Sequence, residues 1–374
     1  MNRNAKTTSR LSSILRPWWV VTFVALVYLG IIVAANGGDP LALATLGTRF
    51  SESDPDGSEG YDGQFAYYIA RDPGDGWRYC DVPAYRYQRI LYPILARLLA
   101  LGQETWIPYT LPLINVAALG VGTWLTEQIL RGYKMSRWYA LTYGLYAGQL
   151  MSVRLDPNEP LSYALVQAAI LSTERERWRW GVLFFALAAL AKETALVFVG
   201  GYLVFLLARR LWRRLAGLAL GVGLPFVAWQ GLLWAWFGRP GLGSGGQGST
   251  SWEILPYRGL WSVGAVDLRA LALLALVMVP LTVIPSLLSL WATVRELWKG
   301  RWHPLTTMLL ANAVVMLFLP QSTFREPLGM LRLTSGLVTA TINYGAGKRS
   351  RRILNYRLLW LASLVFVVKE GPAP

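Results

Sequence analysis

The chain has 374 residues, of which 54% are hydrophobic and only 15% are charged, whereas a soluble globular protein carries about 25% charged residues. Its apolar residues fall into runs of about 16 to 25 separated by short charged segments, a pattern typical of a polytopic membrane protein. A single cysteine, Cys80, and a single histidine, His303, exclude an internal disulfide, a thiolate zinc site and a two-histidine metal site.

Eleven apolar runs are predicted to be transmembrane helices. They cover residues 18–35, 107–126, 138–153, 157–173, 180–194, 195–208, 215–237, 268–294, 304–320, 327–345 and 353–368. Lys192 and Glu193 interrupt one long run, and a break there keeps the following basic cluster on the same side as the others. The predicted fold is an all-α bundle of about eleven spans. Residues 18–374 form one transmembrane domain after a cytoplasmic segment, residues 1–17.

The formal net charge of +15 would suit a nucleic-acid partner if the basic residues shared one soluble surface, but they lie between the apolar runs. With a cytoplasmic N-terminus, the inside segments hold 21 of the 36 lysines and arginines. Outside loops after the first hold one or two each, which is the asymmetry that orients membrane proteins. The first span has no cleavage pattern and is expected to be retained. The prediction is a multi-pass protein of the plasma (cell inner) membrane that binds no nucleic acid.

Two long outside loops are predicted. The first, residues 36–106, begins with a water-facing part that has nine acids against three arginines between residues 36 and 84. Its second part, YRYQRILYPILARLLAL at residues 85–101, has leucine and isoleucine at helical spacing, which predicts a helix lying in the membrane interface. The other loop, residues 238–267, contains the run GLGSGGQGST and is predicted to be flexible.

Four short motifs resemble those of the GT-C glycosyltransferases, particularly the mannosyltransferases of glycosylphosphatidylinositol assembly and their prokaryotic relatives. The string GYDGQFAYYIA at residues 60–70 resembles the family's signature in the first outside loop. Leu91-Tyr92-Pro93 resembles part of a helix in that loop. DPNEPL at residues 156–161 resembles an acid-bearing loop before a span, and AKETAL at 191–196 resembles a family element in which arginine takes the place of Lys192. The resemblance covers residues 15–240.

The resemblance implies a membrane enzyme whose donor is a sugar on a polyprenyl phosphate, transferred with inversion to an acceptor hydroxyl outside the membrane. Such a reaction needs a base for the hydroxyl proton, cations for the phosphate leaving group, and a groove for a lipid chain among the membrane lipids. Asp62 is carried over as the base because it lies in the matching motif. The sugar, the lipid carrier and the acceptor are not fixed by any motif.

Six further residues are predicted to bind substrate. Arginine matches phosphate geometry, which favours Arg86, Arg89 and Arg332, with Lys192 as another cation near the outside. Asp156 or Glu159, at the mouth of a span, is expected to contact the acceptor or a divalent cation, since oxygen ligands suit Mg²⁺ or Mn²⁺. No motif requires a metal, so the cofactor is left open.

Each of these residues also has a plainer structural interpretation. Asp62 can cap the helix that Gly63 opens, and Asp156 can form a capping box with Glu159 around Pro157. The remaining alternatives are a solvated face of an interfacial helix for Arg86 and Arg89, a snorkelling side chain for Arg332, and an ion-paired turn between Lys192 and Glu193.

Two other functions compete with an enzyme. A secondary transporter or flippase for a lipid-linked or small solute needs ionisable residues near the bilayer midplane. Here the acids concentrate in the first outside loop, and Lys192 with Glu193 could be central only if the break between the two runs were absent. A non-catalytic membrane scaffold would not depend on Asp62.

Overall fold

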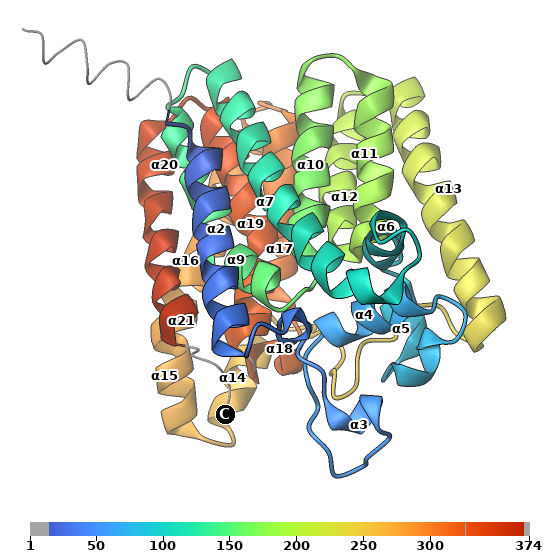
Figure 1. Cartoon of the computed structure of the whole chain (residues 1–374). Helices are drawn as coiled ribbons and strands as arrows, with labels where there is room; N and C mark the ends of the chain where they lie inside the picture. The colour runs from blue at the N-terminus through green and yellow to red at the C-terminus, as the bar shows by residue number, and fades with distance from the viewer. Residues whose placement is uncertain (1–14, 326, 370–374) are drawn as a thin grey trace, which may run out of the picture.

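The computed structural model describes residues 15–325 and 327–369. This part of the chain is all-helical and contains no strand (Figure 1). Of the predicted cytoplasmic segment, residues 1–14 lie outside the described residues. The prediction of an all-α fold is confirmed.

Helices occupy the positions of the predicted spans. The main ones are α2 (Pro17–Ala35), α7 (Ile107–Gly132), α9 (Ala147–Arg154), α10 (Glu159–Glu174), α11 (Trp178–Ala191), α12 (Leu196–Ala208), α13 (Trp212–Phe237), α15 (Leu268–Met278), α16 (Ile284–Trp298), α17 (Pro304–Leu317), α19 (Pro327–Gly347) and α20 (Arg351–Arg357). Helical stretches long and apolar enough to cross a membrane are Pro17–Ala35, Glu104–Gly132, Trp212–Phe237 and Leu268–Trp298. Apolar helices that can span a membrane are therefore present, while the count of eleven stays a prediction.

Two predicted spans are interrupted. The run at 138–153 is divided between α8 (Ala140–Gly144) and α9, because Tyr146 adopts an extended conformation before α9. The run at 353–368 begins as α20, tightens into a 3-10 helix over Leu358–Ser363 and ends in α21 (Leu364–Lys369). By contrast, the predicted break at Lys192 is confirmed: α11 ends at Ala191, and the short turn Glu193–Ala195 leads into α12.

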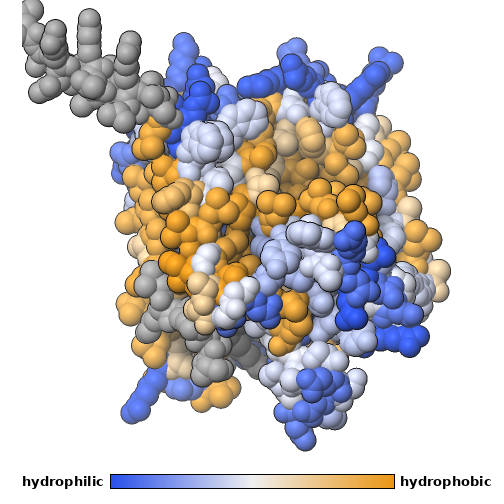
Figure 2. All heavy atoms as spheres, in the orientation of Figure 1, coloured by the Kyte–Doolittle hydropathy of each residue, from blue (hydrophilic) through white to orange (hydrophobic). Residues whose placement is uncertain are grey.

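The bundle has two different ends. In Figure 1 the connections α7–α8, α10–α11 and α12–α13 lie at the top, and the elements of residues 36–106 lie in the lower half, except that the helix at residues 91–99 reaches about mid-height. These connections and the helix ends beside them carry ten basic residues: Arg131, Lys134, Arg137, Arg175, Arg177, Arg179, Arg209, Arg210, Arg213 and Arg214. We call them the basic end and the loop end. Figure 2 shows a hydrophobic belt on the surface of the helices between these two ends. Inside the bundle lies a buried apolar core with members from α2 through α21.

The first long loop packs against the loop end of the bundle as a set of short helices. These are α3 (Thr48–Ser51), α4 (Gly63–Arg71), α5 (Pro83–Tyr87) and α6 (Leu91–Leu99). Helices α4 and α6 contact each other and α7, and α5 contacts α13. The predicted single interfacial helix is thus two helices, of which α6 leaves Leu98 and Leu99 64% and 57% exposed. This arrangement holds α4 and α5 beneath the ends of α10, α12 and α19.

Candidate active site

The start of α4 rests on the connection between α9 and α10. Asp62 directly precedes α4, and a Cβ at Gly63 would lie 2.1 Å from the Leu155 carbonyl oxygen and 2.9 Å from Asp156 Cβ. Only glycine permits this approach of two backbones, because real Cβ atoms do not come so close. Gly63 therefore allows Asp62 and Asp156 to lie next to each other.

Adding one methyl group at Gly63 is expected to disturb the site more than the fold. In Gly63→Ala the start of α4 must move away from Leu155, and a displacement of about 1 Å in a reaction site costs on the order of 10²-fold in rate. Gly200→Ala is the matched control, since nothing lies within 4 Å of the added Cβ. Equal turnover in the two purified variants would contradict this account of Gly63.

The Asp62 carboxylate bridges two arginines. Its Oδ1 accepts from Arg86 Nη1 at 2.8 Å, and its Oδ2 lies 2.8 Å from Arg332 Nη1. The side chain keeps 29% of its surface exposed. Although Asp62 occupies the N-cap position of α4, its side chain accepts no capping hydrogen bond. The interpretation of Asp62 as a helix cap is therefore wrong, and its carboxylate forms ion pairs with the two arginines instead.

The two guanidiniums decide the ionisation of Asp62. Burial alone would raise the pKa of this carboxyl, but the positive charges of Arg86 and Arg332 outweigh burial and hold the pKa well below its usual range. Asp62 is therefore ionised at neutral pH. Anything that drew the two arginines away would raise the pKa of Asp62 and make it a stronger proton acceptor.

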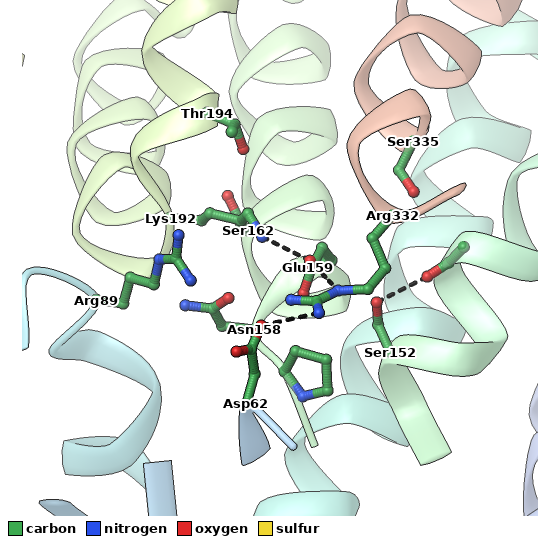
Figure 3. Close-up of polar contacts among 12 residues, drawn as sticks. Asp62, Arg89, Ser152, Asn158, Glu159, Ser162, Lys192, Thr194, Arg332 and Ser335 are labelled. Atoms are coloured by element: carbon green, nitrogen blue, oxygen red, sulfur yellow. Dashed lines mark hydrogen bonds and ion pairs between the residues drawn. The ribbon is translucent and has the colours of Figure 1, made fainter. Parts of the chain in front are cut away.

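Alternating charges continue on both sides of Asp62. Arg86 Nε lies 2.7 Å from Asp81 Oδ1. On the other side Arg332 Nε lies 2.7 Å from Glu159 Oε1, which also accepts from Lys192 Nζ at 2.5 Å. Figure 3 shows Arg332 and Lys192 reaching Glu159 from opposite sides, above Asp62. The resulting ion-pair chain, Asp81–Arg86–Asp62–Arg332–Glu159–Lys192, joins the first loop to α10, α11 and α19.

Arg89 belongs to a second pair beside this chain. Its Nη2 lies 2.6 Å from Glu193 Oε1, its Nε donates to Glu193 Oε2 at 2.9 Å, and its guanidinium lies over the Tyr85 ring. This bidentate geometry is the strong form of an arginine–carboxylate pair. Glu193 therefore holds Arg89, and the predicted ion-paired turn between Lys192 and Glu193 is wrong.

The solvated alternatives for the arginines are also wrong. The side chains of Arg86 and Arg89 are each 10% exposed, and that of Arg332 is 7% exposed. Arg332 lies on α19 and points at Asp62 and Glu159 instead of snorkelling, because these carboxylates compensate its charge inside the protein.

Asp156 lies in the same place but has a different environment. It adopts a left-handed conformation, φ 56°, and α10 begins three residues later with Asn158 as its N-cap. The predicted capping box is therefore wrong, because Asp156 lies two residues before the N-cap position and Glu159 is the first residue of the helix. Asp156 Oδ1 accepts from the Tyr92 hydroxyl at 3.4 Å, whereas the buried Oδ2 has no hydrogen-bond partner in the described structure. Burial raises the pKa of Asp156.

A small pocket connects the two aspartates. It has a volume of about 30 Å³, which is room for one water or one hydroxyl group. Its polar lining consists of Asp62, Arg86, Arg89, Tyr92, Asp156 and Asn158. One aspartate with a lowered pKa and another with a raised pKa thus face one cavity, an arrangement that separates acid and base roles in enzymes.

The glycine-rich loop covers this region. The Gln247 backbone N–H donates to Asp81 Oδ2 at 2.8 Å, and a Cβ at Gly246 would lie 3.0 Å from Arg86 Nη2. Residues 238–267 were predicted to be a flexible linker, and the structure places part of this loop against the Asp81–Arg86 pair. Glycine at 246 leaves space beside the Arg86 guanidinium.

Sequence reasoning found the charged residues of this site but missed several partners. Asp81 and Tyr61 were assigned no role, and Glu193 was assigned only a turn pair with Lys192. In the structure Asp81 pairs with Arg86, Glu193 pairs with Arg89, and the Tyr61 hydroxyl accepts from Arg332 Nη1 at 3.0 Å. Position within the GYDG and AKET motifs was the available signal for Tyr61 and Glu193. For Asp81 the sequence offers none.

Two further sources of evidence about function are a metal-binding cluster and a similar protein. Within residues 15–325 and 327–369, no group of three histidine, cysteine, aspartate or glutamate side chains is placed to hold a metal ion. No family model, curated protein or solved structure matches the chain. The geometry of the site is therefore the basis for inferring a function.

Proposed function

We propose that the protein is a membrane glycosyltransferase of the GT-C type that moves a sugar from a polyprenyl-phosphate donor to an acceptor hydroxyl with inversion. The observation that carries the proposal is the Asp62 carboxylate held between two buried arginines, beside a pocket that a second carboxyl also lines. This combination supplies the phosphate-binding cations and the proton acceptor that such a transfer needs.

In the proposed reaction the donor phosphate binds Arg86 and Arg332 in place of Asp62. Sharing of the two guanidiniums with the phosphate raises the pKa of Asp62, so the carboxylate becomes a competent base as the donor arrives. The acceptor oxygen then forms a bond to the anomeric carbon while the bond from that carbon to the phosphate oxygen breaks. The acceptor proton goes to Asp62, and the electron pair leaves with the phosphate.

The other site residues have supporting roles in this proposal. Asp156 offers its unpartnered Oδ2 to the acceptor hydroxyl. Glu159 and Lys192 are fully buried behind Arg332 and position its guanidinium, and Arg89 is a further cation at the edge of the pocket. A transporter or flippase has less support, because these charges gather at the loop end and the helix break at Lys192 removes a long central helix.

The direct test is transfer by the purified protein. It is incubated with a panel of polyprenyl-phosphate sugars and hydroxyl acceptors, and free polyprenyl phosphate and glycosylated acceptor are measured together. The expected result is their formation in equal amounts with one donor, and loss of both products in Arg332→Gln. Movement of intact donor across vesicle bilayers without either product would instead identify a flippase.

The proposal also requires the loop end to face the outside. Ser58 is exposed on the first loop, so Ser58→Cys is expected to react with a membrane-impermeant thiol reagent added to intact cells. Cys80 should not compete, because burial raises the pKa of its thiol to about 12. Lys299→Cys, in the α16–α17 connection, is the control and should react after permeabilisation alone. The reverse labelling pattern would place the site on the cytoplasmic side.

A further inference from the structure

A second and larger hollow lies on the side of the bundle, between α7 and α10. Its volume is about 750 Å³, within the range of lipid and drug-sized ligand sites. The hollow exists because alanines face it from both helices, Ala117 and Ala118 on α7 and Ala164 and Ala168 on α10, while Trp124 and Phe184 line its sides. Figure 2 shows hydrophobic side chains around this part of the bundle.

The polarity of this groove is uneven along its length. From Leu161 on α10 upward its lining is apolar, and it ends at the basic end with Ser172, Arg175 and Arg177. Within the described residues no ion pair or side-chain hydrogen bond engages either arginine, and both are exposed. The groove therefore has two exposed arginines without an ion pair at one end, where the neighbouring Glu174 and Glu176 are not part of the lining, and apolar side chains at the other end.

Its length matches one leaflet of a bilayer. Leu161 and Ser172 are eleven residues apart on one helix, so the groove runs for about 16 Å at 1.5 Å per residue. Half of the roughly 30 Å hydrocarbon core of a bilayer is about 15 Å. A lipid with its phosphate at Arg175 and Arg177 would thus lay an acyl chain along the whole groove.

We propose that this groove binds an anionic phospholipid from the leaflet at the basic end. Charge complementarity selects the occupant, because Arg175 and Arg177 match a lipid phosphate whose negative charge is not neutralised by a headgroup cation. The chain of a donor bound at Asp62 is a poorer fit. The groove and the site pocket share no lining residue, and Tyr92 of the pocket packs in the same apolar cluster as Ile114 and Leu161 of the groove. The inference does not depend on the proposed glycosyl transfer.

Native mass spectrometry of the whole protein tests the site. The protein is reconstituted in bilayers of equal amounts of phosphatidylglycerol and phosphatidylcholine, released, and its bound lipids are counted. Retention of phosphatidylglycerol over phosphatidylcholine is expected for the native chain. Arg175→Gln with Arg177→Gln should weaken phosphatidylglycerol binding roughly 10- to 30-fold, since each basic residue near a membrane surface contributes about 1 kcal/mol.

Two further variants separate the groove from the general charge of the basic end. Ala168→Phe fills the groove and should displace the lipid while both arginines remain, whereas Ala272→Phe on an exposed face of α15 should not. Arg209→Gln with Arg213→Gln removes equal charge outside the groove and should leave binding unchanged. The proposal is overturned if both lipids are retained equally, if the two arginine pairs have equal effects, or if added polyprenyl phosphate displaces the bound lipid.

Discussion

Replacing Asp62 by asparagine is expected to lower sugar transfer by about 10²- to 10⁴-fold, the contribution that a positioned general base makes. Asparagine keeps the shape of the side chain and can still accept one hydrogen bond, so the protein should insert and purify like the native chain. It cannot take the acceptor proton. The loss should therefore appear in kcat more than in KM, because donor binding by Arg86 and Arg332 survives.

Asp81→Asn is the matched control for this experiment. Asp81 bonds the same Arg86 guanidinium at 2.7 Å but does not line the pocket. It should weaken donor binding, through a less rigid Arg86, and leave kcat largely intact. An equal fall in kcat for the two variants would mean that Asp62 acts by holding Arg86, and the assignment of Asp62 as base would then be wrong.

The composition of this site was predictable because buried charges stand out in an apolar sequence. Asp62, Arg86, Arg89, Glu159, Lys192 and Arg332 were all proposed from motifs and from their place near span ends, and the structure brings them into one region. A charge in such a chain is costly unless a partner or a ligand compensates it. The cost of burying each charge therefore indicated that it needs a partner or a ligand.

The pairing of these charges was not predictable from neighbours in sequence. Local rules joined Lys192 to Glu193 and Asp156 to Glu159, whereas Lys192 pairs with Glu159, 33 residues away, and Arg332 pairs with Glu159, 173 residues away. In a buried site the partner is whichever opposite charge another helix brings close, since the low dielectric strengthens that contact. Helix packing decides this, and no capping motif records it.

Helix number shows the same limit. Hydropathy located the helices, but it could not show that residues 138–153 form two short helices, because the extended conformation of Tyr146 between them leaves no mark in an apolar run. A Cβ at Gly144 would lie 2.4 Å from Thr123 Oγ1 and 2.6 Å from the Val21 side chain. The end of α8 therefore packs closely against α2 and α7.

The largest loss of stability is expected from Glu159→Gln. Glu159 is fully buried and compensates both Lys192 and Arg332, so neutralising it leaves Lys192 without the carboxylate it contacts. Removing one partner from a buried ion pair costs about 3–5 kcal/mol. The variant should unfold at a clearly lower temperature than the native protein in the same detergent. Glu296→Gln, which breaks the partly exposed pair with Lys348, should cost less than about 1 kcal/mol.

A second substitution separates the burial of an unpaired cation from the loss of packing at Glu159. Combining Glu159→Gln with Lys192→Met removes the cation as well as its partner, and the double variant should recover part of the lost stability, because an apolar side chain in that place carries no uncompensated charge. Arg332 retains its ion pair with Asp62 in both the single and the double variant. Two outcomes would contradict this account: a loss of stability in Glu159→Gln as small as that in Glu296→Gln, or a further loss of stability on adding Lys192→Met. In either case water or another anion would have to stabilise Lys192, and the ion-pair chain would be an incorrect description of the site.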